Sequence, residues 1–159
     1  MISNYNQLNK VIGWAVFAVA LITYWLTVEP TVSFWDAGEY IATSSTLQVG
    51  HPPGAPLYQM LGAFFAMFAL EPHQVAYMVN MMSVFSSAFT ILFMFWSLTL
   101  LLRRHILRNL GNDVMILGAS AVGALAFTYT DSFWFNAVEA EGYASSSLLM
   151  SAMFYLGLI

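Results

Sequence analysis

The sequence predicts an all-α protein that crosses a membrane several times. Of its 159 residues, 60% are hydrophobic and only 8% are charged, whereas roughly a quarter of an average soluble protein is charged. The hydrophobic residues are gathered into runs close to the ~20 residues with which an α-helix crosses a hydrocarbon core about 30 Å thick. A water-exposed surface cannot be built from this composition, so we expect a polytopic helical domain.

Four apolar runs are predicted to span the membrane, and they cover residues 11–28, 75–102, 114–130 and 143–159. The first run could instead be a cleaved secretory signal. However, it exceeds the usual apolar core of about 7–15 residues, and no small-residue cleavage site follows it, which favours a retained anchor. The fourth run is still apolar where the sequence stops. We therefore treat residues 1–159 as one partial membrane domain, and we expect it to be the N-terminal piece of a longer protein.

The positions of the cations predict the topology. The chain has four of them: Lys10, Arg103, Arg104 and Arg108. Because Lys and Arg favour the cytoplasmic side, we expect a cytoplasmic N-terminus and extracytoplasmic segments at 29–74 and 131–142. Seven of the eight acids, all except Asp113, then face outward. The three arginines are interpreted as an anchor to anionic lipid.

The first outer segment contains a shorter apolar stretch, residues 55–70, which is interrupted by Pro56 and Gly62. Counting this stretch as a further span would move the arginines to the outside, against the positive-inside rule. We therefore predict an interfacial or re-entrant helix here. The fold class is thus a bundle of transmembrane helices with juxtamembrane helices in its first outer loop.

Two carboxylates in this loop, Asp36 and Glu39, are three residues apart. On a helix they would share one face, within reach of a common ligand. Near a membrane surface, partial desolvation can raise the pKa of a carboxyl group towards the range of a general base. The same spacing is typical of a helix N-terminus, with Asp36 as N-cap and Glu39 at N3. Spacing alone leaves both interpretations open, and the two roles can coexist.

His51 precedes Pro52 and Pro53, which restrict the backbone and stiffen the turn. Such a turn would present the imidazole rigidly at the mouth of the next helix, with Pro56 suited to that helix's first turn. A lone histidine in a loop is more often solvated than catalytic. The stiff turn is therefore the firmer prediction.

The second outer segment carries Asn136, Glu139 and Glu141. Asn136 and Glu139 repeat the cap-like spacing, so they could cap the fourth membrane helix. Alternatively, an amide and several acids at a membrane boundary could bind a cation or the hydroxyls of a sugar.

Together these motifs resemble the GT-C membrane glycosyltransferases, especially the protein O-mannosyltransferases. The closer resemblance is to a family of polytopic bacterial proteins, catalogued as a domain of unknown function and related to a eukaryotic transmembrane O-mannosyltransferase. It rests on the segments Trp35–Glu39, Gly50–Leu57 and Phe133–Tyr143, and it runs along essentially the whole chain.

The resemblance implies transfer of mannose or another hexose from a polyprenyl-phosphate carrier to a Ser or Thr hydroxyl of a protein. The transfer would take place on the outer face of a bacterial inner membrane. Asp36 is then the expected general base, acting with inversion at the anomeric carbon, and Glu39 is a second catalytic carboxylate that positions acceptor or donor. His51 would lie near the carrier phosphate. The other residues expected to contact substrate are Trp35, Tyr40, Asn136, Glu139 and Glu141.

Two features depart from the mannosyltransferase pattern: Ala37 and Gly38 separate the two acids, and no Lys follows the His-Pro-Pro element. Phosphate neutralisation would then fall to His51 or to residues beyond Ile159, and this segment alone is not expected to catalyse transfer. No cofactor is firmly indicated, although a divalent cation would be compatible, and no nucleic-acid partner is expected.

Two other classes of function are alternatives to an enzyme. The main alternative is a non-catalytic membrane protein that binds lipid-linked sugar or scaffolds an envelope assembly. A transporter is disfavoured, because the predicted spans contain almost no ionisable residues.

Overall fold

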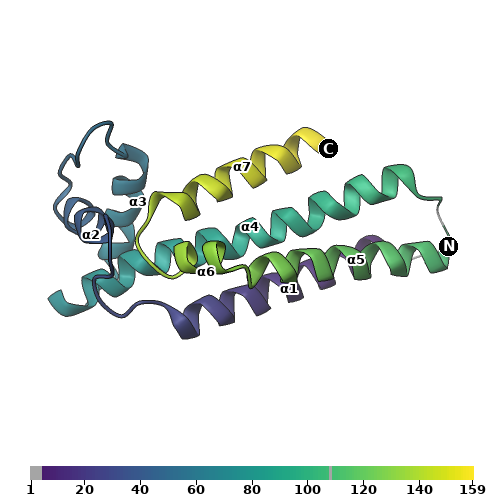
Figure 1. The fold of residues 1–159 in the computed structure, drawn as a ribbon, viewed down its shortest axis with the longest axis horizontal. Coiled ribbons are helices and arrows are strands. Elements are labelled where there is room, and N and C mark those ends of the chain that lie inside the picture. The colour runs from purple at the N-terminus through teal and green to yellow at the C-terminus, as the bar shows by residue number, and fades with distance from the viewer. Residues whose placement is uncertain (1–4, 108) are drawn as a thin grey trace.

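A computed structural model describes residues 5–107 and 109–159, which form seven α-helices and one short 3₁₀ helix. The four long helices are α1 (Tyr5–Thr27), α4 (Val75–His105), α5 (Leu110–Thr128) and α7 (Gly142–Leu158). The short elements are α2 (Ala37–Thr46), α3 (Pro56–Ala66), η1 (Pro72–Gln74) and α6 (Asp131–Ala137). The long helices lie side by side, and α2 and α3 gather at one end of the bundle, against α4 (Figure 1). The predicted all-α fold is confirmed.

Three of the described helices are long and apolar enough to cross a membrane: α1, α4 together with η1, and α5. The chain is therefore a polytopic membrane protein. The fourth predicted span, residues 143–159, corresponds to α7, which has 17 residues. Its length of about 26 Å is slightly less than the ~30 Å hydrocarbon core. Membrane crossing by α7 stays a prediction.

The stretch predicted as an interfacial or re-entrant helix forms α3, which is shorter than expected. It has 11 residues and is therefore about 16 Å long, roughly half the thickness of the hydrocarbon core. A single straight helix of this length cannot cross the membrane. Pro56 lies in its first turn, as predicted, because proline lacks the N–H that this position leaves unpaired in any case.

The long helices alternate in direction, so that the start of α1, the end of α4 and the start of α5 lie at the same end of the bundle (Figure 1). Lys10 in α1 and Arg103 and Arg104 in α4 therefore lie at this end, opposite α2 and α3. This is the arrangement that the predicted topology requires. Arg108 lies outside the described residues.

Arg103 is engaged within the bundle. Its guanidinium carbon lies 3.5 Å from the centre of the Tyr5 ring, and its Nε lies 4.0 Å from a carboxylate oxygen of Asp113, which is 3% exposed. A cation–π contact and an ion pair thus join α1, α4 and α5. Anchoring of Arg103 to anionic lipid stays a prediction. Arg104 donates a hydrogen bond to the Leu158 carbonyl at the end of α7.

The central helix is α4, which packs against α1, α3, α5 and α7. A Cβ at Gly13 of α1 would lie only 2.5 Å from Trp96 Nε1 of α4, so a glycine lets the two helices approach closely. With 31 residues, α4 is about 46 Å long and exceeds the ~30 Å core. The excess length lets its first turns extend beyond the core and support α2 and α3.

Helices α2 and α3 cross at Ser44 and Gly62. Ser44 is fully buried, and a Cβ at Gly62 would lie 2.4 Å from its Oγ and 2.8 Å from its Cβ. Because the Cβ of Ser44 is fixed to the backbone of α2, it cannot turn away. The absence of a side chain at Gly62 therefore sets the spacing of the two juxtamembrane helices.

We expect Gly62→Ala to push α3 away from α2 and to lower the free energy of unfolding by about 1–3 kcal/mol. The measurement is the midpoint of thermal unfolding in detergent. Gly118→Ala in α5 is the matched control, because nothing lies within 4 Å of a Cβ at that position. The control should keep or raise the midpoint, since alanine favours helices over glycine; equal midpoints for the two variants would contradict the close crossing.

Candidate functional site

The segment between α1 and α2 is tied to two other parts of the molecule. Asn80 of α4 is fully buried, and its Nδ2 donates hydrogen bonds to the carbonyls of Glu29 (2.8 Å) and Thr31 (3.0 Å). The N–H of Glu29 donates to the carbonyl of Val138 (3.0 Å), just after α6. These bonds bring together the two outer segments on which the sequence placed its candidate residues.

Asp36 immediately precedes α2, but its side chain does not cap the helix. Its backbone is already helical (φ −83°, ψ −1°), and its carboxylate makes no cap hydrogen bond. A capping side chain normally requires an extended backbone, from which it can reach the N–H groups of the first turn. Asp36 thus occupies the N-cap position and Glu39 the first turn of α2, as predicted, but the capping hydrogen bond does not form. The Asp36 carboxylate is exposed.

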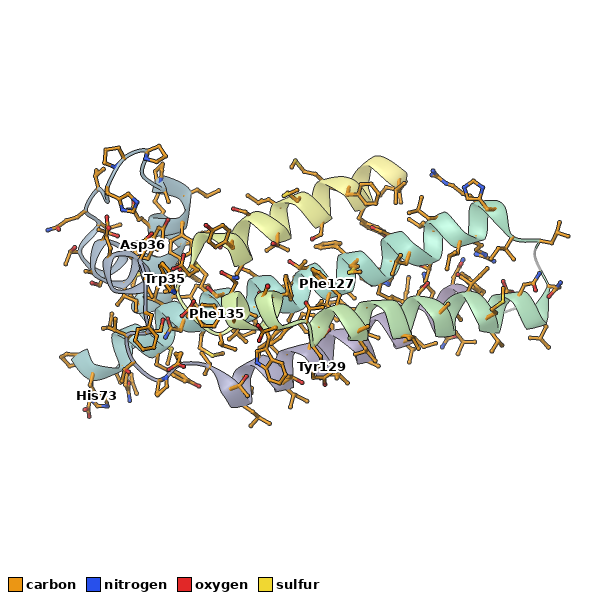
Figure 2. The ribbon with its side chains drawn as sticks, viewed as in Figure 1. Trp35, Asp36, His73, Phe127, Tyr129 and Phe135 are labelled. Atoms are coloured by element: carbon orange, nitrogen blue, oxygen red, sulfur yellow. The ribbon has the colours of Figure 1, made fainter. Side chains whose placement is uncertain are left out.

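Trp35 lies beside Asp36 at this end of the molecule (Figure 2). Its side chain is 82% exposed, and its φ of 58° falls in the left-handed region that few bulky residues adopt. It lines none of the three cavities described below. Substrate contact by Trp35 stays a prediction.

Glu39 forms a two-point contact with His51. One carboxylate oxygen accepts a hydrogen bond from the His51 N–H (2.5 Å), and the other lies 2.7 Å from His51 Nδ1. A Cβ at Gly50 would lie 2.8 Å from the first oxygen, so this geometry depends on glycine before His51. The two residues line a small cavity of about 90 Å³ together with Gln59.

This contact changes the protonation of both partners. The hydrogen bonds that Glu39 accepts hold its pKa below the usual range, because they stabilise the carboxylate. In turn, hydrogen bonding to the carboxylate raises the pKa of His51. An imidazolium is therefore favoured at this position.

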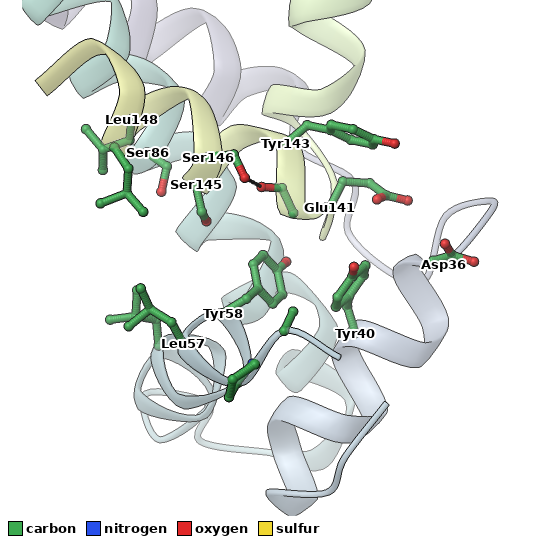
Figure 3. A pocket seen from close by; sticks show the side chains of 15 residues that line it. Asp36, Tyr40, Leu57, Tyr58, Ser86, Glu141, Tyr143, Ser145, Ser146 and Leu148 are labelled. Atoms are coloured by element: carbon green, nitrogen blue, oxygen red, sulfur yellow. Dashed lines mark hydrogen bonds between the residues drawn. The ribbon is translucent and has the colours of Figure 1, made fainter. Parts of the chain in front are cut away.

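The largest of the three described cavities has a volume of about 500 Å³ and lies between α2 and α3 on one side and α4 and α7 on the other (Figure 3). Its polar end carries Asp36, Tyr40 and Glu141, and its apolar wall is built from Leu57, Leu61, Leu148 and Leu149. The remaining lining residues are Ala55, Pro56, Tyr58, Ser86, Gly142, Tyr143, Ser145 and Ser146. Asp36 and Glu39 thus line different cavities and do not face a common ligand.

Two tyrosines form part of the cavity wall. The rings of Tyr40 and Tyr58 lie 4.7 Å apart, and both rise towards Glu141 and Ser145 on the opposite wall (Figure 3). Burial raises the pKa of both hydroxyls. Both therefore stay protonated at neutral pH and can donate hydrogen bonds.

Glu139 and Glu141 are both buried, with 2% and 7% of their surface exposed. Burial is the main cause that raises the pKa of each carboxyl group, and for Glu141 the neighbouring charges of Glu139 and Asp36 act in the same direction. Glu141 lines the large cavity, whereas Glu139 lines none of the three. Substrate contact by Glu139 would therefore require the surrounding turn to open.

Asn136 and Glu139 do not cap the fourth long helix. Asn136 lies within α6, where its Nδ2 donates to the Ser132 carbonyl (2.7 Å). The N-cap position of α7 is occupied by Glu141, whose side chain makes no cap bond. This prediction was wrong because Asn136 belongs to α6, a helix that the sequence analysis did not predict, and Glu139 lies in the turn between α6 and α7.

A second cavity of about 240 Å³ lies beside the first. It is lined by Phe127, Thr130, Ser132, Phe133, Asn136, Tyr143, Ala144 and Ser147. Tyr143 lines both cavities. Residues 5–107 and 109–159 contain no group of three or more His, Cys, Asp or Glu side chains that could hold a metal ion.

The sequence analysis missed several residues of the site, notably Asn80, Tyr58 and Ser145. For Asn80 a signal was present, since it is the only Asn or Gln in the predicted span 75–102. A strongly polar side chain within an apolar run commonly marks a structural or functional contact. Tyr58 and Ser145 carry no comparable signal, because they read as ordinary first-turn residues of apolar helices.

Comparison with known proteins shows which family the chain matches. Residues 36–159 match the family described as Protein O-mannosyl-transferase TMEM260 N-terminal domain. The chain is 25% identical over 143 residues to protein O-mannosyl-transferase tmem260 of Dictyostelium discoideum, covering 89% of this chain and 16% of that protein. It is 27% identical over 146 residues to protein O-mannosyl-transferase TMEM260 of Mus musculus, covering 89% of this chain and 18% of that protein.

The chain thus spans less than a fifth of the length of these two relatives. No solved structure matches it. The resemblance to O-mannosyltransferases that the sequence motifs indicated is confirmed by the match over residues 36–159. The chain belongs to the family of the protein O-mannosyl-transferase TMEM260 N-terminal domain.

Proposed function

We propose that the protein is a membrane glycosyltransferase. It transfers mannose or another hexose from a polyprenyl-phosphate carrier to a Ser or Thr hydroxyl of a protein on the outer face of the membrane. The observation that carries this proposal is the cavity of about 500 Å³, which joins a carboxylate-bearing end to an apolar wall. The names of the two relatives, both protein O-mannosyl-transferases, support it.

In this proposal Asp36 is the general base. Its carboxylate takes the proton of the acceptor hydroxyl while the acceptor oxygen forms a bond to the anomeric carbon. The bond from that carbon to the phosphate oxygen breaks, the polyprenyl phosphate leaves with the electron pair, and the anomeric configuration inverts. An exposed carboxylate at the edge of the cavity is accessible to a protein acceptor, and orientation supplies much of the remaining rate.

The rest of the cavity suits an amphipathic donor. Tyr40 and Glu141 can hydrogen-bond to sugar hydroxyls, and Glu141 does so as a donor when its carboxyl group is protonated. The leucines of α3 and α7 offer an apolar surface for the polyprenyl chain. Trp35 and Asn136 flank this region and would contact the acceptor.

The donor phosphate is negatively charged and needs a positive partner. The titratable side chains lining the large cavity, two carboxylates and three tyrosines, do not supply one. Lys10, Arg103 and Arg104 lie at the opposite end of the bundle. His51 lies in the adjoining small cavity, which shares Tyr40 and Ala55 with the large one. We therefore assign phosphate contact to His51 and assign Glu39 the role of keeping it protonated. A divalent cation would be a second source of charge, and the described residues offer it no complete ligand set.

The same charge distribution supports the proposed orientation. With the N-terminus in the cytoplasm of a bacterial cell, the described cations, which lie at the same end of the bundle as the N-terminus, face the cytoplasm. The cavity then opens on the extracytoplasmic face of the inner membrane, where a lipid-linked donor lies at the bilayer surface.

Asp36→Asn should lower transfer by roughly 10²–10⁴-fold, which is the usual contribution of a general base. The fold should be unaffected, because the Asp36 side chain makes no cap bond. The measurement is mass spectrometry of hexose on Ser and Thr of envelope proteins, in cells expressing either variant at equal level. Asp131→Asn, at an exposed acid that lines none of the three cavities, is the control. An unchanged glycan profile would favour the alternative, a non-catalytic protein that binds lipid-linked sugar or scaffolds an envelope assembly.

Glu39→Gln should lower the pKa of His51, since hydrogen bonding to Glu39 is the main cause that raises it above 6.5. The pair contributes fully to stability between about pH 4.5 and 6.5, the ordinary values of the two groups. Its contribution is lost as the pH rises through the raised pKa of His51 or falls through the lowered pKa of Glu39. The measurement is the pH dependence of His51 modification by diethyl pyrocarbonate, followed by mass spectrometry.

The control for this experiment is Glu71→Gln, because Glu71 lies 3.2 Å from His73 and contacts a different histidine. It should change the profile of His73 and leave that of His51 unaltered. Identical His51 profiles with and without the Glu39 carboxylate would show that the pair does not form.

The orientation can be tested by cysteine labelling, since the 159 residues contain no cysteine. Val49→Cys, at a position 88% exposed beside the small cavity, should react with a membrane-impermeant maleimide in intact cells. Leu107→Cys, at a position 83% exposed between α4 and α5, should react only after permeabilisation. Labelling of the Leu107 variant in intact cells would reverse the assignment.

A further inference from the structure

Asn80 lies in the sixth position of α4 and is fully buried. Both hydrogens of its amide are donated outside its own helix, to the carbonyls of Glu29 and Thr31 at 2.8 and 3.0 Å. These residues follow the end of α1 and precede Asp36 in the same irregular segment. Asn80 is the buried partner, so breaking either bond would leave one of its amide hydrogens unpaired, which is costly away from water. The amide therefore holds this stretch of backbone in one position.

The hydrogen bonds from Asn80 form a tether, and this tether continues to the second outer segment. The N–H of Glu29 donates to the carbonyl of Val138 at 3.0 Å, three residues before Glu141. The peptide groups of Glu29 are thus bound on one side to α4 and on the other to the turn between α6 and α7. The segment that carries Asp36 and the segment that carries Glu141 are therefore both held by hydrogen bonds to Glu29.

Such a tether is needed because Asp36 and Glu141 line one cavity from different parts of the chain. Two carboxylates at one site repel each other when both are charged, and this repulsion acts to separate the segments that carry them. Of the small neutral side chains, only an amide can donate two hydrogens to two carbonyls, since a hydroxyl has one to donate. The chemistry at position 80 is therefore restricted to this side chain.

From this geometry we propose that Asn80 is a positioning residue, which sets the base Asp36 opposite Glu141 across the cavity without contacting substrate. The catalytic consequence rests on the proposed glycosyltransferase function. The coupling of the two outer segments does not, because it follows from the hydrogen bonds alone.

The coupling is tested by spin labels on single cysteines in the full-length protein, reconstituted in lipid vesicles. Thr31→Cys places a label on an exposed side chain whose backbone carbonyl Asn80 binds. Val49→Cys places the comparison label on a loop residue outside the tether. With Asn80 present, the label at position 31 should be the less mobile of the two. Equal mobility at the two positions would overturn the proposal, and this comparison does not depend on the folding of any Asn80 variant.

The positioning role is tested with Asn80→Leu, which preserves the approximate volume and removes both donated hydrogens. The label at position 31 should become as mobile as the label at position 49, which should not change. The kcat for transfer should fall on the order of 10–100-fold, with the donor KM within about twofold of its original value. Thr90→Val is the matched control, because Thr90 is buried in the same helix and its hydroxyl bonds only to the Ser86 carbonyl of that helix.

The outcomes are separable. Mobilisation of the label with an unchanged kcat would overturn the positioning role, as would an equal loss of kcat in the Thr90→Val control. Absence of transfer in the protein that retains Asn80 would count against the proposed function, and the label comparison would still decide whether the tether exists.

Discussion

The arrangement of the outer segments depends on the requirement that a buried polar side chain find hydrogen-bond partners. After α1 ends at Thr27, the chain runs in irregular form past the fully buried Asn80 of α4, and its carbonyls have no partner within a helix. One amide, on Asn80, satisfies two of them. Because the neighbouring N–H of Glu29 is bound to Val138, the two outer segments meet at a fixed place. The cavity with Asp36 and Glu141 lies between the α2–α3 pair and helices α4 and α7, and the two outer segments that this junction joins supply these two acids.

The long helices could be predicted from the sequence because each is encoded locally, by an apolar run of nearly sufficient length. Contacts between distant residues could not be predicted in this way. Nothing in the sequence indicated that Arg103 lies over Tyr5 and beside Asp113, which are 98 and 10 residues away in the chain. The helix α6 was missed because its seven residues mix acid, amide and aromatic side chains, and such a short segment shows no clear helical period. Asp36 and Glu39 do lie at the start of α2, as their spacing predicted, but no capping bond forms because the backbone at Asp36 is helical and not extended.

For the site itself, the motifs identified residues more reliably than roles. Asp36, Tyr40 and Glu141 do line one cavity, although they lie on segments about 100 residues apart in the sequence. Glu39 instead contacts His51 through a geometry that depends on Gly50, and spacing alone cannot reveal such a dependence. Glu139 and Glu141 are both buried, but only Glu141 lines the cavity, so a shared motif did not predict a shared role.

The length of α4 also determines how the site responds to the bilayer. A helix of about 46 Å in a core of about 30 Å leaves roughly three turns outside the hydrocarbon, counted over both ends; α2 and α3, which form one side of the cavity, pack against this helix. Membranes differ in thickness by a few ångströms according to their lipids. A thicker bilayer would cover more of this overhang and bring the carboxylates closer to the headgroups, whereas a thinner one would raise them into water. The lipid composition therefore sets the depth at which an acceptor chain must approach.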